Sequence, residues 1–209
     1  MAKILVAIGD SITKGTYTSD TDTGANSVAP MPFAAIVAER LGYDFINRGM
    51  NGTSVSRTAR VFPEHAMSVR IDRTEPADIL LVAAGTNDYG GNLDLGSPDD
   101  REDVSFFGGL WVFFERIKAR YDKVFIITPI PRRDDGKNSA GYTLDDYRGA
   151  IETRAAEFGF PVIDGRGVRI DPKTPEGRRL HMRDGLHPNE AGHALYAEYV
   201  IEEILRLES

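Results

Sequence analysis

An apolar run over residues 4–8, ending in Gly9-Asp10-Ser11-Ile12, is the feature that most restricts the fold of this chain. A short run of Ile, Leu, Val and Ala that stops at a glycine is typical of a strand buried in a parallel sheet and followed by a turn. Open sheets of this kind bind ligands at the carboxyl ends of their strands. Ser11 therefore stands where a binding or catalytic residue is expected.

Strand-like and helix-like segments alternate along the rest of the chain. The predicted strands cover residues 3–8, 44–47, 79–84, 124–128 and 161–164. The predicted helices cover residues 33–41, 63–73, 106–121, 143–158 and 190–207. Strands separated by helices pair in parallel through right-handed crossovers, so we expect a three-layer α/β/α sandwich. Residues 13–30, which are rich in Thr, Ser, Asp and Gly, are expected to form a loop.

The composition favours one globular domain over residues 1–209. The chain is 41% hydrophobic and 27% charged, and no linker, repeat or low-complexity tract divides it. Its net charge of -7 argues against nucleic acid as a partner, since phosphate binding needs a basic face. No apolar stretch approaches the roughly 18 residues of a membrane helix, so we expect no membrane partner. Cysteine is absent and no signal peptide is recognisable, so we expect a cytoplasmic protein.

Three further segments supply the groups that a serine nucleophile needs. A serine hydroxyl requires a base within reach, a group that orients the base, and donors aimed at the oxyanion. In Asp184-Gly185-Leu186-His187-Pro188, His187 is the candidate base, and the carboxylate of Asp184 can turn back to one imidazole nitrogen. Gly52 can offer a backbone N–H to the oxyanion, and Asn87, in Gly85-Thr86-Asn87-Asp88, can offer a side-chain N–H.

Each segment also has a purely structural explanation. Ser11 could cap a helix, Asn87 could belong to a turn, and His187 could lie in a surface turn before a helix. Asp10 and Asp88 are interpreted as structural residues that accept hydrogen bonds from loop backbone. The joint occurrence of the segments is what favours catalysis.

Other polar residues are candidates for lesser roles. His181 is the rival base, but it lacks an aspartate three residues before it. His193, within the last predicted helix, is interpreted as a surface or packing residue. Arg132 follows the fourth predicted strand, and an arginine there could favour acidic or sugar-linked substrates.

The four segments that contain Ser11, Gly52, Asn87 and His187 together resemble the SGNH hydrolases, also called the GDSL esterase/lipase superfamily. They occur in the family's order and span nearly the whole chain, and Ile12 in place of the family's Leu is a mild departure. The resemblance implies a flavodoxin-like fold with five parallel strands in the order 2-1-3-4-5. It implies Ser11 as nucleophile, His187 as base and Asp184 as the residue that orients His187. The oxyanion hole would comprise the backbone N–H groups of Ser11 and Gly52 and the side chain of Asn87, and no metal or cofactor is implied.

The expected activity is hydrolysis of a small-molecule ester through an acyl-enzyme on Ser11. The loops expected to rim the pocket, residues 13–30, 89–105 and 130–142, are polar, and no long apolar lid is recognisable. We therefore expect short-chain or acetyl esters, including acetyl groups on carbohydrate. Two alternatives stay open: acyl transfer to an acceptor other than water, and a catalytically silent module on the same fold that binds glycans or a partner protein. The sequence indicates no oligomeric state.

Overall fold

The computed structural model describes residues 2–20, 22–58 and 63–209. Its central sheet is parallel and comprises β1 (Ile4–Gly9), β4 (Asp44–Gly49), β5 (Ile79–Ala83), β6 (Val124–Ile127) and β7 (Val162–Ile163). The order across the sheet is β4-β1-β5-β6-β7, which is 2-1-3-4-5 when these strands are numbered along the chain. The predicted strand order is therefore confirmed.

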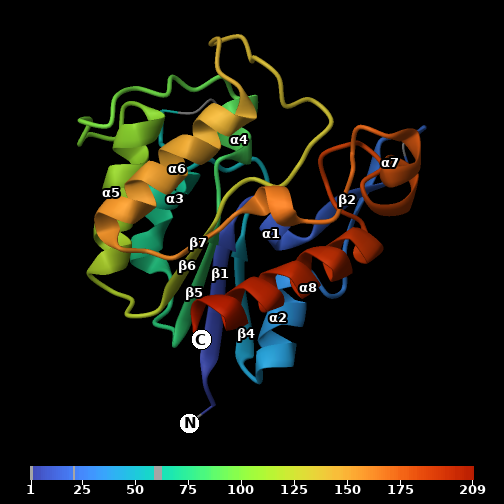
Figure 1. The fold of residues 1–209 in the computed structure, drawn as a ribbon, viewed down its shortest axis with the longest axis horizontal. Coiled ribbons are helices and arrows are strands. Elements are labelled where there is room, and N and C mark those ends of the chain that lie inside the picture. The colour runs from blue at the N-terminus through green and yellow to red at the C-terminus, as the bar shows by residue number, and fades with distance from the viewer. Residues whose placement is uncertain (1, 21, 59–62) are drawn as a thin grey trace.

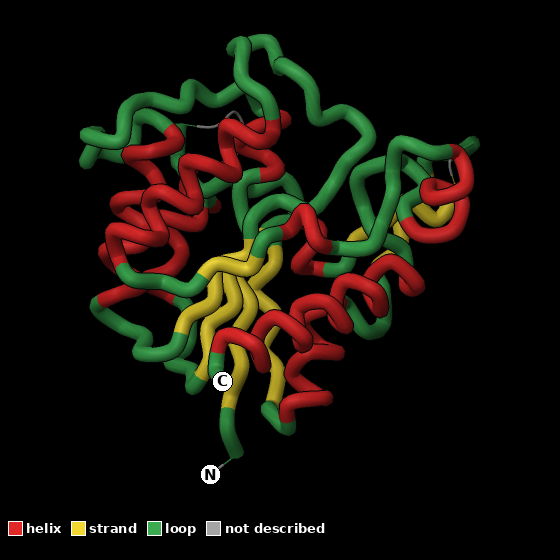
Figure 2. Tube along the Cα trace, in the orientation of Figure 1, coloured by secondary structure: helices red, strands yellow, loops and turns green. Residues whose placement is uncertain are grey.

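Helices cover both faces of the sheet (Figures 1 and 2). One face carries α3 (Met67–Arg70), α5 (Phe106–Lys118) and α6 (Leu144–Phe158), and the other carries α2 (Phe33–Leu41) and α8 (Glu190–Leu207). The shorter helices are α1 (Ser11–Lys14), α4 (Thr86–Gly90) and α7 (Pro175–His181). This arrangement is the predicted three-layer α/β/α sandwich. Within the described ranges, none of the helices combines the length and apolarity needed to cross a bilayer.

The strand side chains alternate between the two helical layers. Val6 and Ile8 of β1 join the apolar cluster formed with α3, α5 and α6. Leu5 and Ala7 join the cluster formed with α2 and α8. All four side chains are buried. An uninterrupted apolar run is therefore required in β1, because both faces of the strand are covered.

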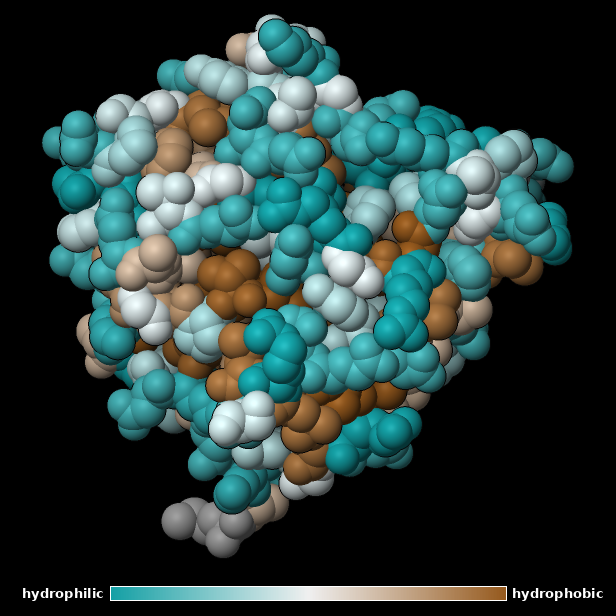
Figure 3. Space-filling model, in the orientation of Figure 1, coloured by the Kyte–Doolittle hydropathy of each residue, from teal (hydrophilic) through white to brown (hydrophobic). Residues whose placement is uncertain are grey.

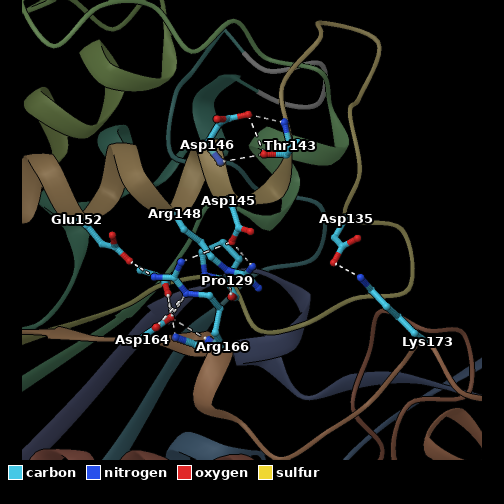
Figure 4. Close-up of polar contacts among 12 residues, drawn as sticks. Pro129, Asp135, Thr143, Asp145, Asp146, Arg148, Glu152, Asp164, Arg166 and Lys173 are labelled. Carbon is cyan, nitrogen blue, oxygen red and sulfur yellow. Dashed lines mark hydrogen bonds and ion pairs between the residues drawn. The ribbon is translucent and has the colours of Figure 1, made fainter.

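The predicted helix ends at α2 and α6 are confirmed. Gly42 ends α2 in the left-handed conformation, with φ 77°, which glycine adopts without steric cost. Thr143 caps α6 through a capping box: its side chain accepts from the backbone N–H of Asp146, whose carboxylate accepts from the backbone of Thr143 (Figure 4).

Two predicted segments were wrong. Residues 13–30 are not simply a loop, because they contain an antiparallel hairpin of β2 (Thr16–Asp20) and β3 (Ala25–Val28). This hairpin is polar, with β2 mostly half-buried and β3 mostly exposed, so it lacks the alternation of apolar and polar residues that identifies a half-buried strand in a sequence. The predicted helix over residues 63–73 is divided into η1 (Pro63–His65), α3 and η2 (Ile71–Arg73), since Ala66 has a non-helical ψ of 144°.

A network of ion pairs and hydrogen bonds joins α6 to the ends of β6 and β7 (Figure 4). The buried guanidinium of Arg148 donates to the carbonyl of Pro129 (Nε–O 2.8 Å), just after β6. Arg166, in η3 (Gly165–Gly167), pairs with Asp164 (2.8 Å) and with Glu152 of α6 (2.6 Å). These contacts fix the loops at the carboxyl edge of the sheet, where the candidate site lies.

Candidate active site

Ser11 lies at the junction of β1 and α1. Asp10 is the N-cap of α1, because its Oδ1 accepts from the backbone N–H of Ile12 at 2.8 Å. Ser11 therefore does not cap the helix, and its hydroxyl is available for another contact. A β-carbon on Gly9 would lie 2.0 Å from the hydroxyl oxygen of Thr13 and 2.7 Å from the carbonyl oxygen of Ala83, so glycine permits the close packing of this turn. The turn leaves Ser11 at the carboxyl end of the central strand with 7% of its surface exposed.

His187 connects Ser11 to Asp184 through two hydrogen bonds. The Ser11 Oγ lies 2.9 Å from His187 Nε2, and His187 Nδ1 lies 2.7 Å from Asp184 Oδ2. A carboxylate can only accept, so Nδ1 carries the proton and leaves Nε2 as the acceptor for the serine hydroxyl. The sequence separates Ser11 from His187 by 176 positions, and the fold brings them into direct contact.

The segment between α7 and α8 holds Asp184 as an ionised acceptor. Asp184 Oδ1 accepts from the backbone N–H groups of Leu186 (2.9 Å) and His187 (2.8 Å). Burial opposes ionisation of Asp184, but the hydrogen bonds from the ring and backbone of His187 and from Leu186 outweigh it. The pKa of Asp184 is therefore held well below its usual range.

Gly52 and Asn87 lie in segments that border the end of β1. Gly52 occupies an exposed turn with φ 71°. This turn is anchored on the carbonyl of Gly9, which accepts from the backbone N–H of Met50 (3.1 Å), and the hydroxyl of Thr53 donates to the carbonyl of Met50 (2.9 Å). The side-chain amide of Asn87 donates to the carbonyl of Thr53 (2.9 Å), and because an amide has two N–H donors, the second stays available.

The remaining histidines are placed away from the contact with the serine. His193 is fully buried in α8, where its Nδ1 accepts from the backbone N–H of Phe33 at 3.3 Å, so it is a packing residue. Burial lowers the pKa of His193 to about 4. His181 ends α7, and its backbone carbonyl accepts from Asn189 at 2.8 Å. His187, rather than His181, therefore meets Ser11.

Sequence reasoning missed the contribution of the β2–β3 hairpin. The hydroxyl of Thr18, in β2, donates to Asp184 Oδ2 at 2.9 Å. A threonine in a Thr-rich segment carries no signal for such a contact, since its partner lies 166 positions away. Among the described residues, no group of three or more His, Asp and Glu side chains is arranged to hold a metal ion.

Comparison with known proteins supports one family. A search of curated proteins finds no match. Solved structures with the same fold include a protein from Lactobacillus plantarum, which is 25% identical (TM-score 0.82; 100% of this chain and 98% of that chain covered). They also include an aryl esterase from M. smegmatis, which is 17% identical (TM-score 0.73; 99% and 100% covered). A salicylyl-acyltransferase from a tetracycline biosynthetic pathway is 19% identical (TM-score 0.68; 100% and 55% covered).

The family assignment comes from the sequence itself. The profile of the GDSL-like lipase/acylhydrolase family matches residues 7–195, which include the end of β1, Ser11, Gly52, Asn87 and the Asp184–His187 segment. The strand order agrees with the resemblance that the four sequence segments indicated. This chain belongs to the GDSL-like lipase/acylhydrolase family.

Proposed function

We propose that the protein is a serine esterase that hydrolyses short-chain or acetyl esters through an acyl-enzyme on Ser11. The observation that carries this proposal is the chain of hydrogen bonds from Ser11 through His187 to Asp184 (2.9 and 2.7 Å). A hydroxyl, a base and an orienting carboxylate in this order can perform acyl transfer on any fold that presents them together.

The first half of the reaction forms the acyl-enzyme. Ser11 Oγ attacks the ester carbonyl carbon while His187 Nε2 takes its proton, giving a tetrahedral oxyanion and an imidazolium. Asp184 keeps Nδ1 protonated and stabilises the imidazolium by its negative charge. His187 then gives its proton to the leaving alcohol as the ester C–O bond breaks.

The second half regenerates the free enzyme. A water molecule attacks the acyl carbonyl carbon, and His187 Nε2 takes the proton from this water. Collapse of the second tetrahedral intermediate returns the proton to Ser11 Oγ and releases the carboxylic acid.

Donors for the oxyanion come from three parts of the chain. Ser11 is the first residue of α1, and the first N–H groups of a helix have no acceptor within it. The backbone N–H of Gly52 and the second N–H of Asn87 complete the proposed set. The contact of Asn87 with Thr53 (2.9 Å) supports this role, because it fixes the amide beside the segment that follows Gly52.

The surroundings favour a small acyl group. The β2–β3 hairpin and the loop over residues 130–142 carry mainly polar side chains. In the orientation of Figure 1, hydrophilic residues dominate the loops above and beside the sheet, and the hydrophobic areas of this face are interrupted by them (Figure 3). A lipase that acts at an oil surface needs a contiguous apolar face.

The test is hydrolysis of p-nitrophenyl esters by the parent, Ser11→Ala and the exposed control Ser139→Ala. We expect Ser11→Ala to lower kcat by a factor of about 10⁶, and Ser139→Ala to retain full activity. The acetate should be turned over faster than long-chain esters. Full activity in folded Ser11→Ala would overturn the assignment of the nucleophile, and a preference for long chains would overturn the substrate class.

Acyl transfer and silent binding are distinguished in the same assay. An added alcohol or sugar acceptor that diverts most of the acyl group from water would identify a transferase, which is the activity named for one structural neighbour. Absence of turnover with both acetyl and longer esters in the parent would favour the silent binding module.

A further inference from the structure

The β2–β3 hairpin contacts three of the segments that carry proposed catalytic groups. At its base, the backbone N–H of Ala29 donates to the carbonyl of Gly15, which ends the helix of Ser11 (2.8 Å). Also at its base, the hydroxyl of Thr16 donates to Asn51, next to Gly52 (2.8 Å). Further along, the carbonyl of Ser19 accepts from the guanidinium of Arg183, which directly precedes Asp184 in the sequence. The hairpin therefore joins the serine, the Gly52 turn and the aspartate segment.

Thr18 makes the most direct of these contacts. Its hydroxyl lies 2.9 Å from Asp184 Oδ2 and 3.4 Å from the side-chain oxygen of Asn26. A hydroxyl has one proton, and both the shorter distance and the negative charge direct it to Asp184. Asp184 Oδ2 is thus shared by the Thr18 hydroxyl and His187 Nδ1, while Oδ1 accepts the two backbone N–H groups.

These four hydrogen bonds have different effects on the carboxylate. Rotation about the last side-chain bond moves both carboxylate oxygens together, and the two backbone N–H groups that oppose it through Oδ1 come from the same segment as Asp184. The Thr18 hydroxyl opposes that rotation, because it reaches Oδ2 from a separate element of the fold.

We infer that Thr18 is a positioning residue that fixes the Asp184 carboxylate toward His187, an inference that rests on the proposed esterase function. Without the hydroxyl, the contact between Asp184 and His187 is formed for a smaller share of the time. The imidazolium is then less stabilised, so catalysis slows.

Other charged and titratable groups face the Asp184–His187 pair from several elements. Asp10 at the end of β1 and His193 in α8 interact electrostatically with His187, Arg183 directly precedes Asp184, and the backbone N–H of Arg133 donates to the carbonyl of Gly185 (2.7 Å). Replacement of Thr18 by valine changes none of these charges. A changed pH profile would therefore report the lost hydroxyl contact.

The experiment compares the parent, Thr18→Val, Thr18→Ser and the matched control Thr23→Val with p-nitrophenyl acetate. Thr23 lies in the same hairpin, and its hydroxyl contacts Asp20 rather than a proposed catalytic residue (2.8 Å). We expect Thr18→Val to lower kcat about tenfold, which corresponds to one hydrogen bond to a charged group. Its KM should stay within about twofold, and the acid limb of kcat/KM against pH should move to lower pH. Thr18→Ser and Thr23→Val should match the parent.

Each result decides the inference. An unchanged kcat and pH profile in Thr18→Val would overturn it, and so would equal losses in Thr18→Val and Thr23→Val. A shift of the acid limb to higher pH would also overturn it, because Thr18 would then act only by withdrawing charge from the carboxylate. If Thr18→Val does not fold by circular dichroism, Thr18→Ala replaces it. Parent turnover that Ser11→Ala abolishes tests the esterase function separately.

Discussion

The buried carboxylate of Asp88 accepts a hydrogen bond from the backbone N–H of Val55, which lies 3.0 Å from both carboxylate oxygens. The N–H of Ser56 lies 3.3 Å from Oδ1. The neighbouring Asn87 donates to the carbonyl of Thr53. Two consecutive residues of α4 therefore hold one short segment, with Asp88 as acceptor and Asn87 as donor, and this segment directly follows Gly52.

We expect Asp88→Ala to lower kcat by about 10- to 100-fold, because the Gly52 turn would be misplaced and with it the backbone N–H proposed for the oxyanion hole. It should also destabilise the fold, since two buried N–H groups lose their acceptor. Asp88→Asn keeps one acceptor oxygen and should lose less activity. The measurement is kcat and KM with p-nitrophenyl acetate, and equal kcat in Asp88→Ala and the parent would contradict the expected role.

The protonation of Asp88 makes stability fall as the pH rises. Burial raises the pKa of Asp88 to about 7, so the native state keeps a proton that the unfolded chain releases from about pH 4 upward. As the pH rises from about 4 to 7, the free energy of unfolding of Asp88→Asn should increase by roughly 4 kcal/mol relative to that of the parent. Urea unfolding across this range measures the difference, and a constant difference would refute the prediction.

His193 should make stability depend on pH in the opposite direction to Asp88. Burial lowers its pKa to about 4, so between about pH 6.5 and 4 the unfolded chain binds a proton that the native state does not. Its contribution to stability is therefore lost as the pH falls. The side chain of His193→Asn can still accept from Phe33. As the pH falls from 6.5 to 4, the free energy of unfolding of this variant should rise by roughly 3 kcal/mol relative to that of the parent. Difference curves from urea unfolding isolate this effect from other titrating groups, and a flat curve would exclude it.

Gly49 sets how closely β4 approaches the helix of Ser11. A β-carbon at this position would lie 2.2 Å from the backbone nitrogen of Lys14, the last residue of α1. We expect Gly49→Ala to cost about 1–3 kcal/mol of stability and to reduce kcat, because backbone rather than a flexible side chain must move. Gly149→Ala is the control, since nothing lies within 4 Å of its β-carbon position. It should keep full activity and gain about 0.5–1 kcal/mol.

The buried strands and the longer amphipathic helices could be predicted from the sequence. Apolar runs such as residues 79–84 identify strands that are covered on both faces, and caps such as Gly42 and Thr143 mark helix ends. These signals are local, because each depends on residues within a few positions of one another. The β2–β3 hairpin was not predicted because its polar residues bury little apolar surface and so leave no hydrophobic pattern in the sequence.

The candidate site was predictable in its residues but not in its supporting contacts. Ser11, Asp184 and His187 stand out because they follow or precede recognisable elements. The contact between Thr18 and Asp184 and the close approach of Gly49 to Lys14 depend on how distant elements pack. A single sequence carries no pairing information for such contacts.

Arg132 is a half-buried cation at the edge of the segment that carries Asn87. Its guanidinium lies over the ring of Tyr89 at 5.0 Å and reaches the carbonyl of Thr86 at 3.4 Å. Among the ion pairs between described residues, none includes Arg132, whereas the exposed Arg133 pairs with Asp134 at 3.3 Å. Arg132 therefore has donors to spare for a substrate that bears a negative charge.

We expect Arg132→Gln to lower kcat/KM about tenfold for a p-nitrophenyl ester of a dicarboxylic acid, which corresponds to about 1.4 kcal/mol. The acyl group of the acetate ester carries no carboxylate that could contact Arg132, so kcat/KM for this ester should change less than about twofold. Arg133→Gln is the matched control, because its guanidinium is exposed and already paired. The ratio of kcat/KM for the two esters measures the effect, since any general loss of activity cancels in it. An equal ratio in Arg132→Gln and the parent would show that Arg132 does not select for charge.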